Sequence, residues 1–130
     1  MINEFAIFTG TAKRLSGTET KTTYVVGKVS DLACLIVDDM VTTGGTVAEA
    51  ITALLRAGAR PEIIVAATHG LFVGGARRKV SHPAVRHVLV TDTVRVPETC
   101  WPELQVISIA PLIAGAVNRL VADGSLSELA

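Results

Sequence analysis

The stretch Leu35-Ile36-Val37-Asp38-Asp39-Met40-Val41-Thr42-Thr43-Gly44-Gly45-Thr46 carries the strongest structural signal in this chain. It begins with an apolar run typical of a buried strand, and two adjacent carboxylates end that run. A turn rich in threonine and glycine leads into residues 46–57, where apolar side chains recur at helical spacing. Thr46 and Glu49 have capping-box spacing, and Gly58 follows as the glycine after the last turn. The stretch therefore predicts a strand, a short turn and a helix.

Further apolar runs continue this alternation along the chain. They are rich in β-branched residues and do not alternate with polar ones, which predicts strands buried on both faces. A second helix is predicted from Pro111 onward, and a shorter one over residues 75–80. Strands that alternate with helices predict an α/β domain with a doubly wound, mostly parallel sheet flanked by helices. The predicted strands include residues 24–26, 35–37, 63–67, 88–90 and 106–109.

The composition limits the class of protein. A chain of 130 residues is expected to form a single domain, and its 49% of hydrophobic residues excludes a disordered chain. Aromatic residues make up only 4%, so the core must consist of Val, Ile, Leu and Ala. Twelve basic and twelve acidic residues give no net charge, which argues against non-specific binding of nucleic acid.

The cysteines and the termini predict a cytoplasmic protein without a membrane partner. Cys34 and Cys100 form no C-x-x-C pair, so neither a disulfide framework nor a zinc site is implied. The N-terminus lacks the basic, apolar and small-residue series of a signal peptide. No apolar stretch approaches the roughly 18–20 residues of a membrane helix.

The turn after the two carboxylates has the chemistry of an anion site. Ligands of open α/β sheets bind beyond the carboxyl ends of the strands. Glycines let a ligand approach the backbone, threonines add hydroxyl donors, and the start of the helix favours an anion such as phosphate. Asp38 and Asp39 could then accept hydrogen bonds from sugar hydroxyls, directly or through a metal. The alternative is that these two acids simply begin a turn. Neither a Walker A loop nor a G-x-G-x-x-G pattern is present.

Residues 38–46 resemble the phosphoribosyl-diphosphate (PRPP) motif of type I phosphoribosyltransferases. More narrowly, the chain resembles the C-terminal half of ribose-phosphate pyrophosphokinases, also called PRPP synthetases. The resemblance covers about residues 12–130. It implies the type I phosphoribosyltransferase fold. It rests on further stretches in the family's order: residues 25–29, 66–72, 90–93, 108–113 and 125–129.

The resemblance implies a reaction and a site. Family members transfer the diphosphoryl group of ATP to the 1-hydroxyl of ribose 5-phosphate with Mg²⁺, giving PRPP and AMP. Asp38 and Asp39 would hold the ribose hydroxyls. The 5-phosphate would lie on the loop formed by Thr42, Thr43, Gly44, Gly45 and Thr46.

The chain departs from the family pattern in three ways. Residues 9–23 read as one long loop, and within it the arginine of the family's catalytic Lys-x-Arg falls on Arg14, whereas the lysine falls on Ala12. Lys13, beside it, would serve only after a shift of one residue. Thr42 stands where many synthetases have a third acid. The family's N-terminal half, which supplies most ATP contacts, has no counterpart here.

Three functions remain open on these grounds. The chain could be a synthetase-like half that binds ribose 5-phosphate and turns over ATP only with a complementary half. It could be a free-standing phosphoribosyltransferase that uses PRPP, although no segment that would bind a base is apparent. It could also be a non-catalytic regulatory or binding module. Family members form oligomers, so a homo-oligomer is expected.

Several other residues have both a structural and a functional interpretation. A hydrogen-bonding role in the fold is favoured for His69, and His82 and His87 have no metal-ligand spacing with it. Asp92 could support the site or only a turn. The remaining candidates are Arg77-Arg78-Lys79 as a solvated face or a second phosphate site, Ser125 and Ser127 as a regulatory phosphate site, and Trp101 as a packing or interface anchor.

Overall fold

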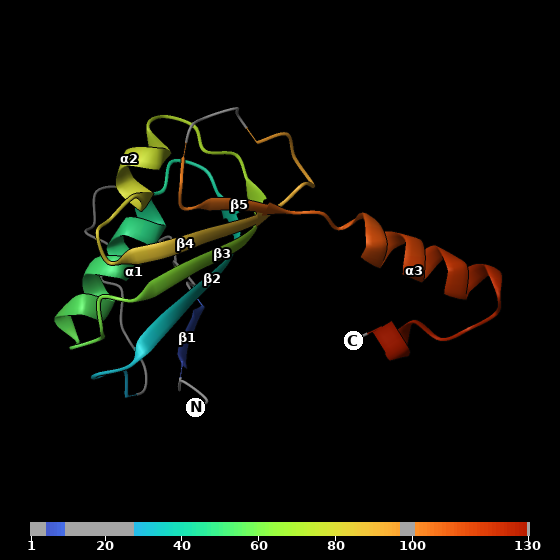
Figure 1. Cartoon of the computed structure of the whole chain (residues 1–130), viewed down its shortest axis with the longest axis horizontal. Coiled ribbons are helices and arrows are strands. Elements are labelled where there is room, and N and C mark those ends of the chain that lie inside the picture. Colours follow the sequence, from blue (N-terminus) through green and yellow to red (C-terminus); the bar gives the residue numbers. More distant parts are fainter. Residues whose placement is uncertain (1–4, 10–27, 97–100, 130) are drawn as a thin grey trace, which may run out of the picture.

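A computed structural model describes residues 5–9, 28–96 and 101–129, and its centre is a parallel five-stranded sheet (Figure 1). The strands lie side by side in chain order. Every neighbouring pair is parallel. The predicted α/β class with a parallel sheet is therefore confirmed. The strands are β1 (Phe5–Thr9), β2 (Ala33–Val41), β3 (Ile63–Gly70), β4 (Val85–Thr91) and β5 (Leu104–Ile107).

In the described ranges, three α-helices and one short 3₁₀ helix, η1 (Leu126–Leu129), accompany the sheet. Helix α1 (Gly45–Arg56) connects β2 to β3, and α2 (Ala76–Val80) connects β3 to β4. Because parallel crossovers are right-handed and the strands advance in one direction, both helices lie on the same face of the sheet (Figure 1). Helix α3 (Ala110–Val121) follows β5.

The core fills the space between the sheet and α1. Ile36 and Val65 lie opposite each other in the β2–β3 register and are almost completely buried. Leu54 and Ile51 of α1 have no more than 1% of their surface exposed and belong to the same cluster. Trp101 packs at the edge of this core against Phe72, with ring centroids 4.8 Å apart in an edge-to-face arrangement. Trp101 therefore has the packing role that its sequence suggested.

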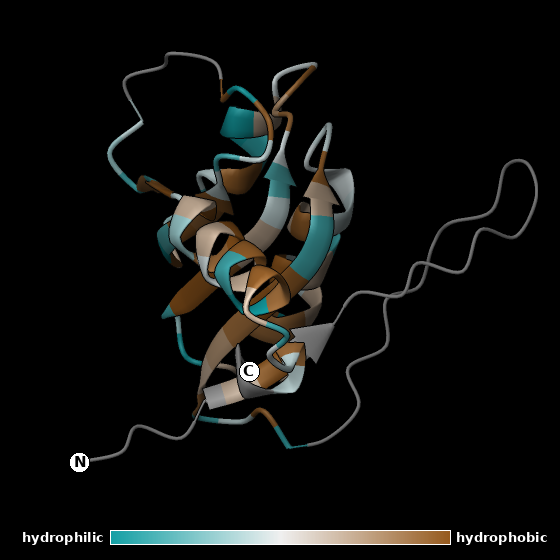
Figure 2. Ribbon diagram, turned by 90° about the vertical axis from the view of Figure 1, so that its right-hand side faces the viewer, coloured by the Kyte–Doolittle hydropathy of each residue, from teal (hydrophilic) through white to brown (hydrophobic). Residues whose placement is uncertain are grey.

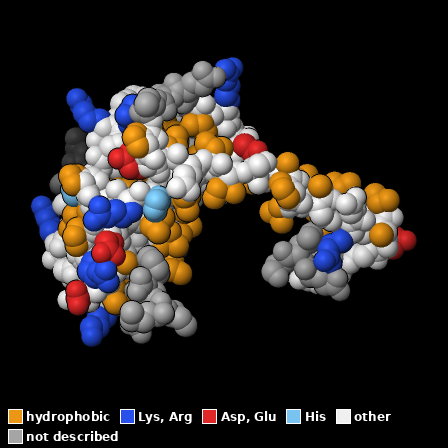
Figure 3. Space-filling view, viewed as in Figure 1, with side chains coloured by type: hydrophobic (Ala, Val, Ile, Leu, Met, Phe, Trp, Pro, Cys, Tyr) orange, Lys and Arg blue, Asp and Glu red, His pale blue; other side chains and the backbone are white. Residues whose placement is uncertain are grey.

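The opposite face of the sheet is more exposed than the sequence predicted. Strands buried on both faces were expected, but burial alternates along β2 and β3 because α1 and α2 cover only one side. Figure 3 shows apolar side chains gathered on the side that none of the described helices covers, below the segment that leads from β5 to α3. We call this surface the open face. Register and exposure assign to it Ile7, Leu35, Val37, Ile64, Ala66, Leu89 and Ile107.

Helix α3 extends away from the sheet (Figure 1). Its start is close to the predicted one, but the predicted packing of its apolar face is not found, since none of its residues is buried. β5 ends at Ile107, two residues earlier than expected. Here the Ile109 amide donates to Asp92 Oδ1 at 2.9 Å instead of continuing the strand. Asp92 thus ties the end of β4 to the start of α3.

The ends of the other elements differ from the predictions in small ways. Helix α1 begins one residue early, at Gly45, and no side chain caps it, so the predicted capping box is wrong. Gly58 has φ 86° directly after the C-cap residue, which confirms its predicted role. The short helix predicted over 75–80 is present as α2. β1 was not predicted, and the strand predicted at 24–26 lies outside the described residues.

Replacing either of the two neighbouring glycines at the start of α1 by alanine is predicted to have opposite effects on stability. Gly44 has φ 73°, and a Cβ built there would lie 2.9 Å from Val80 Cγ2 and 3.2 Å from the Ala76 carbonyl oxygen. Gly44→Ala should therefore lower the free energy of unfolding by about 1–3 kcal/mol. Gly45 has negative φ, and the nearest atom to its Cβ would be 3.8 Å away. Gly45→Ala should leave stability unchanged or raise it by about 0.4–1 kcal/mol.

Urea denaturation of both variants and the parent measures this difference. Equal losses of stability in Gly44→Ala and Gly45→Ala would show that the close approach of the turn to α2 is not a constraint on folding.

Candidate ligand-binding site

Polar side chains gather at the carboxyl ends of the central strands. In Figure 2 the hydrophilic segments of two strands lie next to their arrowheads, whereas apolar colour predominates at their other ends. These ends carry Asp38 and Asp39 on β2, and Thr68, His69 and Thr91 on β3 and β4. Parallel strands bring their carboxyl ends to one edge, which is where ligands of open α/β sheets bind.

Asp38 and Asp39 lie within β2, not after it as the sequence suggested, because the strand continues to Val41. Successive residues of a strand point to opposite faces. Asp38 is therefore on the same side as Ile36, toward α1, and is half-buried, whereas Asp39 is exposed. The Asp39 amide donates to Asp38 Oδ1 at 2.9 Å. Burial, together with the neighbouring Asp39 side chain, raises the pKa of Asp38.

The turn that follows β2 is held by the chain after β3. The amides of Leu71 and Phe72 both donate to the Val41 carbonyl oxygen, and the Val73 amide donates to that of Thr42 at 2.9 Å. Gly44 is buried against α2. Thr42 and Thr43 remain exposed, and Gly45 and Thr46 are half-buried. The fold therefore fixes the backbone of the turn and leaves its hydroxyl groups accessible.

The start of α1 has free hydrogen-bonding capacity. The first backbone hydrogen bond of the helix runs from the Ala48 amide to the Gly44 carbonyl oxygen. The amides of Gly45, Thr46 and Val47 precede that bond and have no partner within the helix. Within the described part of the chain no side chain caps the helix, and no acidic residue lies in its first turn. Such an N-terminus attracts an anion through its N–H groups and its dipole.

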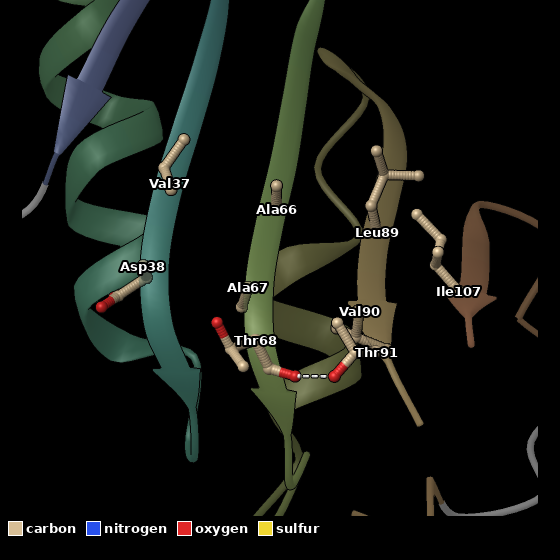
Figure 4. Close-up of a pocket in the computed structure, with 9 residues that line it drawn as sticks. All are labelled: Val37, Asp38, Ala66, Ala67, Thr68, Leu89, Val90, Thr91 and Ile107. Carbon is tan, nitrogen blue, oxygen red and sulfur yellow. Dashed lines mark hydrogen bonds between the residues drawn. The ribbon is translucent and has the colours of Figure 1, made fainter. Parts of the chain in front are cut away.

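A cavity of about 220 Å³ lies next to this site, on the open face (Figure 4). Its lining is mostly apolar and includes Val37, Ala66 and Ile107. Thr68 and Thr91 lie at one end of it, and the carboxylate of Asp38 points away from the other lining side chains (Figure 4). None of residues 42–46 lines it. The turn over residues 42–46 and the cavity are therefore separate features.

A hydroxyl network at the ends of β3 and β4 was not predicted. The Thr91 hydroxyl donates to the Thr68 carbonyl oxygen at 2.7 Å and lies 2.9 Å from Thr93 Oγ1. His69 Nδ1 lies 2.7 Å from the same Thr93 hydroxyl. His69 therefore has the structural hydrogen bond that its sequence context favoured. Three threonines at strand ends were the available signal for this network.

The other sequence candidates have local partners. His82 Nδ1 accepts from the Ala84 amide at 3.1 Å, and His87 Nδ1 lies 3.3 Å from Gln105 Nε2. Ser125 and Ser127 share a hydrogen bond of 2.7 Å between their hydroxyl oxygens. The basic residues 77–79 are exposed on α2, as a solvated face would be. Hydrogen bonds from Ser108 and the Ile109 amide lower the pKa of Asp92, which serves the connection to α3.

Lys13 and Arg14, the predicted catalytic residues, lie outside the described residues, as does Ala12. Across residues 5–9, 28–96 and 101–129, no three His, Cys, Asp or Glu side chains are grouped to hold a metal ion. No helix in the described ranges has the length and apolar character needed to cross a membrane. Cys34 is buried as a free thiol, and burial raises its pKa.

Comparison with known proteins agrees with this architecture. The model of the phosphoribosyl synthetase-associated domain matches residues 11–130. Ribose-phosphate pyrophosphokinases from Corynebacterium glutamicum and Bifidobacterium longum are 41% and 44% identical over 105 and 106 residues, which is 81% of this chain. The match spans about a third of those relatives, 32% and 31% of their length.

A solved structure agrees with the sequence comparison. The crystal structure of phosphoribosylpyrophosphate synthetase from Mycobacterium smegmatis superimposes with a TM-score of 0.70 at 37% identity. The superposition covers 82% of this chain and 36% of that chain. Fold, motif and matched length together show that the chain belongs to the phosphoribosyl synthetase-associated domain family and has the α/β fold of PRPP synthetases.

Proposed function

We propose that the carboxyl edge of this sheet binds ribose 5-phosphate or PRPP. The observation that carries the proposal is the uncapped N-terminus of α1 beside the Asp38–Asp39 pair. The 5-phosphate would accept hydrogen bonds from the amides of residues 45–47 and from the threonine hydroxyls of the turn. Each hydrogen bond to a charged group contributes roughly 1.5–3 kcal/mol, so a few of them suffice to hold a sugar phosphate.

The two carboxylates suit the ribose ring and Mg²⁺. Carboxylate and hydroxyl oxygens are the donors that Mg²⁺ prefers, and it usually keeps several waters and shares its ligands with a phosphate. Asp38 and Asp39 fit this description, since Asp39 is exposed and Asp38 is only half-buried. Bound Mg²⁺ would neutralise diphosphate charge. Asp38 and Asp39 would accept hydrogen bonds from the ribose hydroxyls and so orient the sugar.

The reaction to which this site would contribute is diphosphoryl transfer. The O1 oxygen of ribose 5-phosphate would bond to the β-phosphorus of ATP, and the bond from that phosphorus to the oxygen shared with the α-phosphorus would break. AMP would leave with that oxygen, and the O1 proton would pass to water. Lys13 and Arg14 are proposed to offset the charge of the transferring group.

The chain corresponds to about a third of the length of its pyrophosphokinase relatives. We propose that it supplies the ribose-phosphate site and that ATP contacts come from another polypeptide or segment. A non-catalytic module that keeps the sugar-phosphate site remains the second candidate. The alanine at position 12, where the family has its catalytic lysine, favours it.

Calorimetric titration with ribose 5-phosphate and Mg²⁺ tests the binding site. Thr46→Ala removes a hydroxyl donor and Asp38→Asn removes a charged acceptor, so each should raise the Kd by roughly ten- to a hundredfold. Gly45→Ala, whose fold is expected to be intact, should also weaken binding, because its methyl group would lie 3.8 Å from Thr43 Oγ1, one of the hydroxyl groups proposed to bind the phosphate.

Asp31→Asn is the matched control, since Asp31 is exposed, has φ 61° and lies at the opposite end of β2 from Asp38. Its Kd should equal that of the parent. If the parent, Thr46→Ala and Asp38→Asn bind ribose 5-phosphate with equal affinity, the proposed sugar-phosphate site is wrong.

Turnover separates the proposed half-site from a complete enzyme. Incubation of the chain with ATP, ribose 5-phosphate and Mg²⁺ should give no AMP above the uncatalysed background, measured by chromatography. Robust AMP formation by the chain alone would contradict the division of labour, while leaving the sugar-phosphate site in place.

The pKa of Asp38 predicts how stability and binding depend on pH. Burial raises this pKa above the ordinary value of 3.8, so the ionised carboxylate costs stability. That cost is absent below the unfolded-state pKa and appears as the pH rises through the folded-state pKa. Asp38→Asn should therefore melt at a higher temperature than the parent at pH 7, and the difference should shrink toward pH 3.

Thermal melting of the parent, Asp38→Asn and Asp31→Asn between pH 3 and 7 provides the measurement. A lower melting temperature for Asp38→Asn at neutral pH would show that the carboxylate is needed by the fold and not kept for a ligand.

A further inference from the structure

Phe72, which follows β3, has a backbone conformation that its residue type rarely adopts. Its φ is 47°, in the left-handed region, where a side chain costs free energy and glycine is favoured. A bulky residue keeps such a conformation only where the surrounding structure holds it there, and residues of this kind concentrate at functional sites. The contacts of the Phe72 ring and of its backbone therefore need an explanation.

The ring of Phe72 packs between Gly70 and Trp101. A Cβ built at Gly70 would lie 2.6 Å from Phe72 Cε2, so the ring occupies the space that a side chain at position 70 would need. The ring meets Trp101 edge to face, and Trp101 is only 5% exposed. Aromatic pairs of this geometry contribute more to stability than the area that they bury. The ring is therefore held from two sides.

The backbone of Phe72 in turn holds the start of the proposed binding loop. The amides of Leu71 and Phe72 donate to the Val41 carbonyl oxygen at 3.0 and 3.1 Å, and the Val73 amide donates to the Thr42 carbonyl oxygen at 2.9 Å. Val41 ends β2 and Thr42 begins the turn. The segment to which Phe72 belongs therefore sets where that turn lies.

Trp101 is attached to a different part of the sheet. Its carbonyl oxygen accepts from the Leu104 amide at 3.1 Å, at the start of β5. Among the described residues its indole Nε1 has no hydrogen-bond acceptor, although it is buried. An unpaired buried donor costs free energy, which a leucine or a phenylalanine would avoid. The edge-to-face contact with Phe72 is therefore the feature that accounts for an indole at this place.

We infer that Trp101 is a positioning residue for the proposed sugar-phosphate site. It holds the Phe72 ring, the ring holds the left-handed backbone, and that backbone holds Val41 and Thr42. The inference rests on the proposed function, and it adds that the affinity of the turn for phosphate depends on an aromatic pair outside the turn. Because Trp101 is buried, it acts through Phe72 and not by touching the ligand.

A pair that only filled the core would behave differently. Trp101 belongs to the core cluster and Phe72 packs against it, so truncating either side chain lowers the melting temperature in both cases. Ile63 provides the comparison, because it is completely buried at the start of β3, the end of the strand opposite to Phe72. Ile63→Val also lowers the melting temperature, but it leaves the residues that hold the turn unchanged.

Amide hydrogen exchange followed by NMR tests the inference without a ligand. In Trp101→Leu the amides of residues 71–73 should exchange about tenfold or more faster than in the parent, relative to the core amides of β3, because their segment opens locally. Trp101→Phe, which keeps an aromatic ring, should recover most of the protection. Ile63→Val should leave the relative exchange of residues 71–73 unchanged.

Calorimetry with ribose 5-phosphate and Mg²⁺ tests the same variants for binding, at a temperature well below their melting temperatures. Trp101→Leu and Phe72→Leu should each raise the Kd about five- to tenfold, and the double variant should bind no more weakly than the weaker single variant, because both act through one contact. Trp101→Phe should recover most of the lost affinity. Ile63→Val should bind like the parent.

The two measurements separate this inference from the proposed function. Unchanged relative exchange of residues 71–73 in Trp101→Leu would overturn the inference, whether or not the parent binds ribose 5-phosphate. Equal Kd values in the parent and Trp101→Leu, with weakened binding in Thr46→Ala, would also overturn it and would leave the sugar-phosphate site in place. Faster exchange of residues 71–73 in a chain that does not bind ribose 5-phosphate would refute the proposed ligand and support the control of the turn by Trp101.

Discussion

At the turn between β2 and α1 the backbone of Gly44 has φ 73° and lies so close to α2 that any side chain would meet Val80. This contact sets where α1 begins, and hence where its unpaired amides lie relative to Asp38. The bonds from Leu71, Phe72 and Val73 hold the same turn from the other side. The site thus depends on a backbone held between two parts of the connection from β3 to β4, namely residues 71–73 and α2. The exposed threonine hydroxyls of the turn are attached to a backbone that is already fixed, and this lowers the entropic cost of binding a ligand.

Much of this arrangement could be predicted from the sequence because its signals are local. The apolar run before Asp38, the glycines after it and the helical spacing of residues 46–57 each determine their own conformation. The extent of β2 could not be predicted in this way. Ladder bonds with β3 continue past Asp38 to Val41, since the register to Gly70 is available, and tertiary pairing overrides the preference of acids for turns. The Thr91–Thr93–His69 network is likewise a product of register between β3 and β4.

The coverage of the sheet shows a second limit of local patterns. Unbroken apolar runs were interpreted as strands buried on both faces, yet α1 and α2 cover only one face. The apolar runs are consistent with both faces of the sheet being apolar. A local sequence pattern does not indicate which segment or polypeptide covers the second face. The same holds for α3, whose apolar face was recognisable while its packing partner was not.

Asp38 connects the fold to the proposed function more closely than any other residue described. It shares the α1 side of β2 with the core residue Ile36, and burial raises its pKa. A fold selected only for stability would place an apolar or amide side chain at the same position, because a partly buried carboxylate without a cation beside it weakens the native state. The carboxylate accepts a hydrogen bond from the Asp39 amide at 2.9 Å, and the Met40 amide also favours its charged form. A carboxylate has about four acceptor sites, so part of its capacity is still available to a ligand. The uncapped amides of residues 45–47 at the start of α1 also have unused hydrogen-bonding capacity, but as donors. A ligand that brings hydroxyl donors to one group and a phosphate to the other would satisfy both, and a sugar phosphate has that combination.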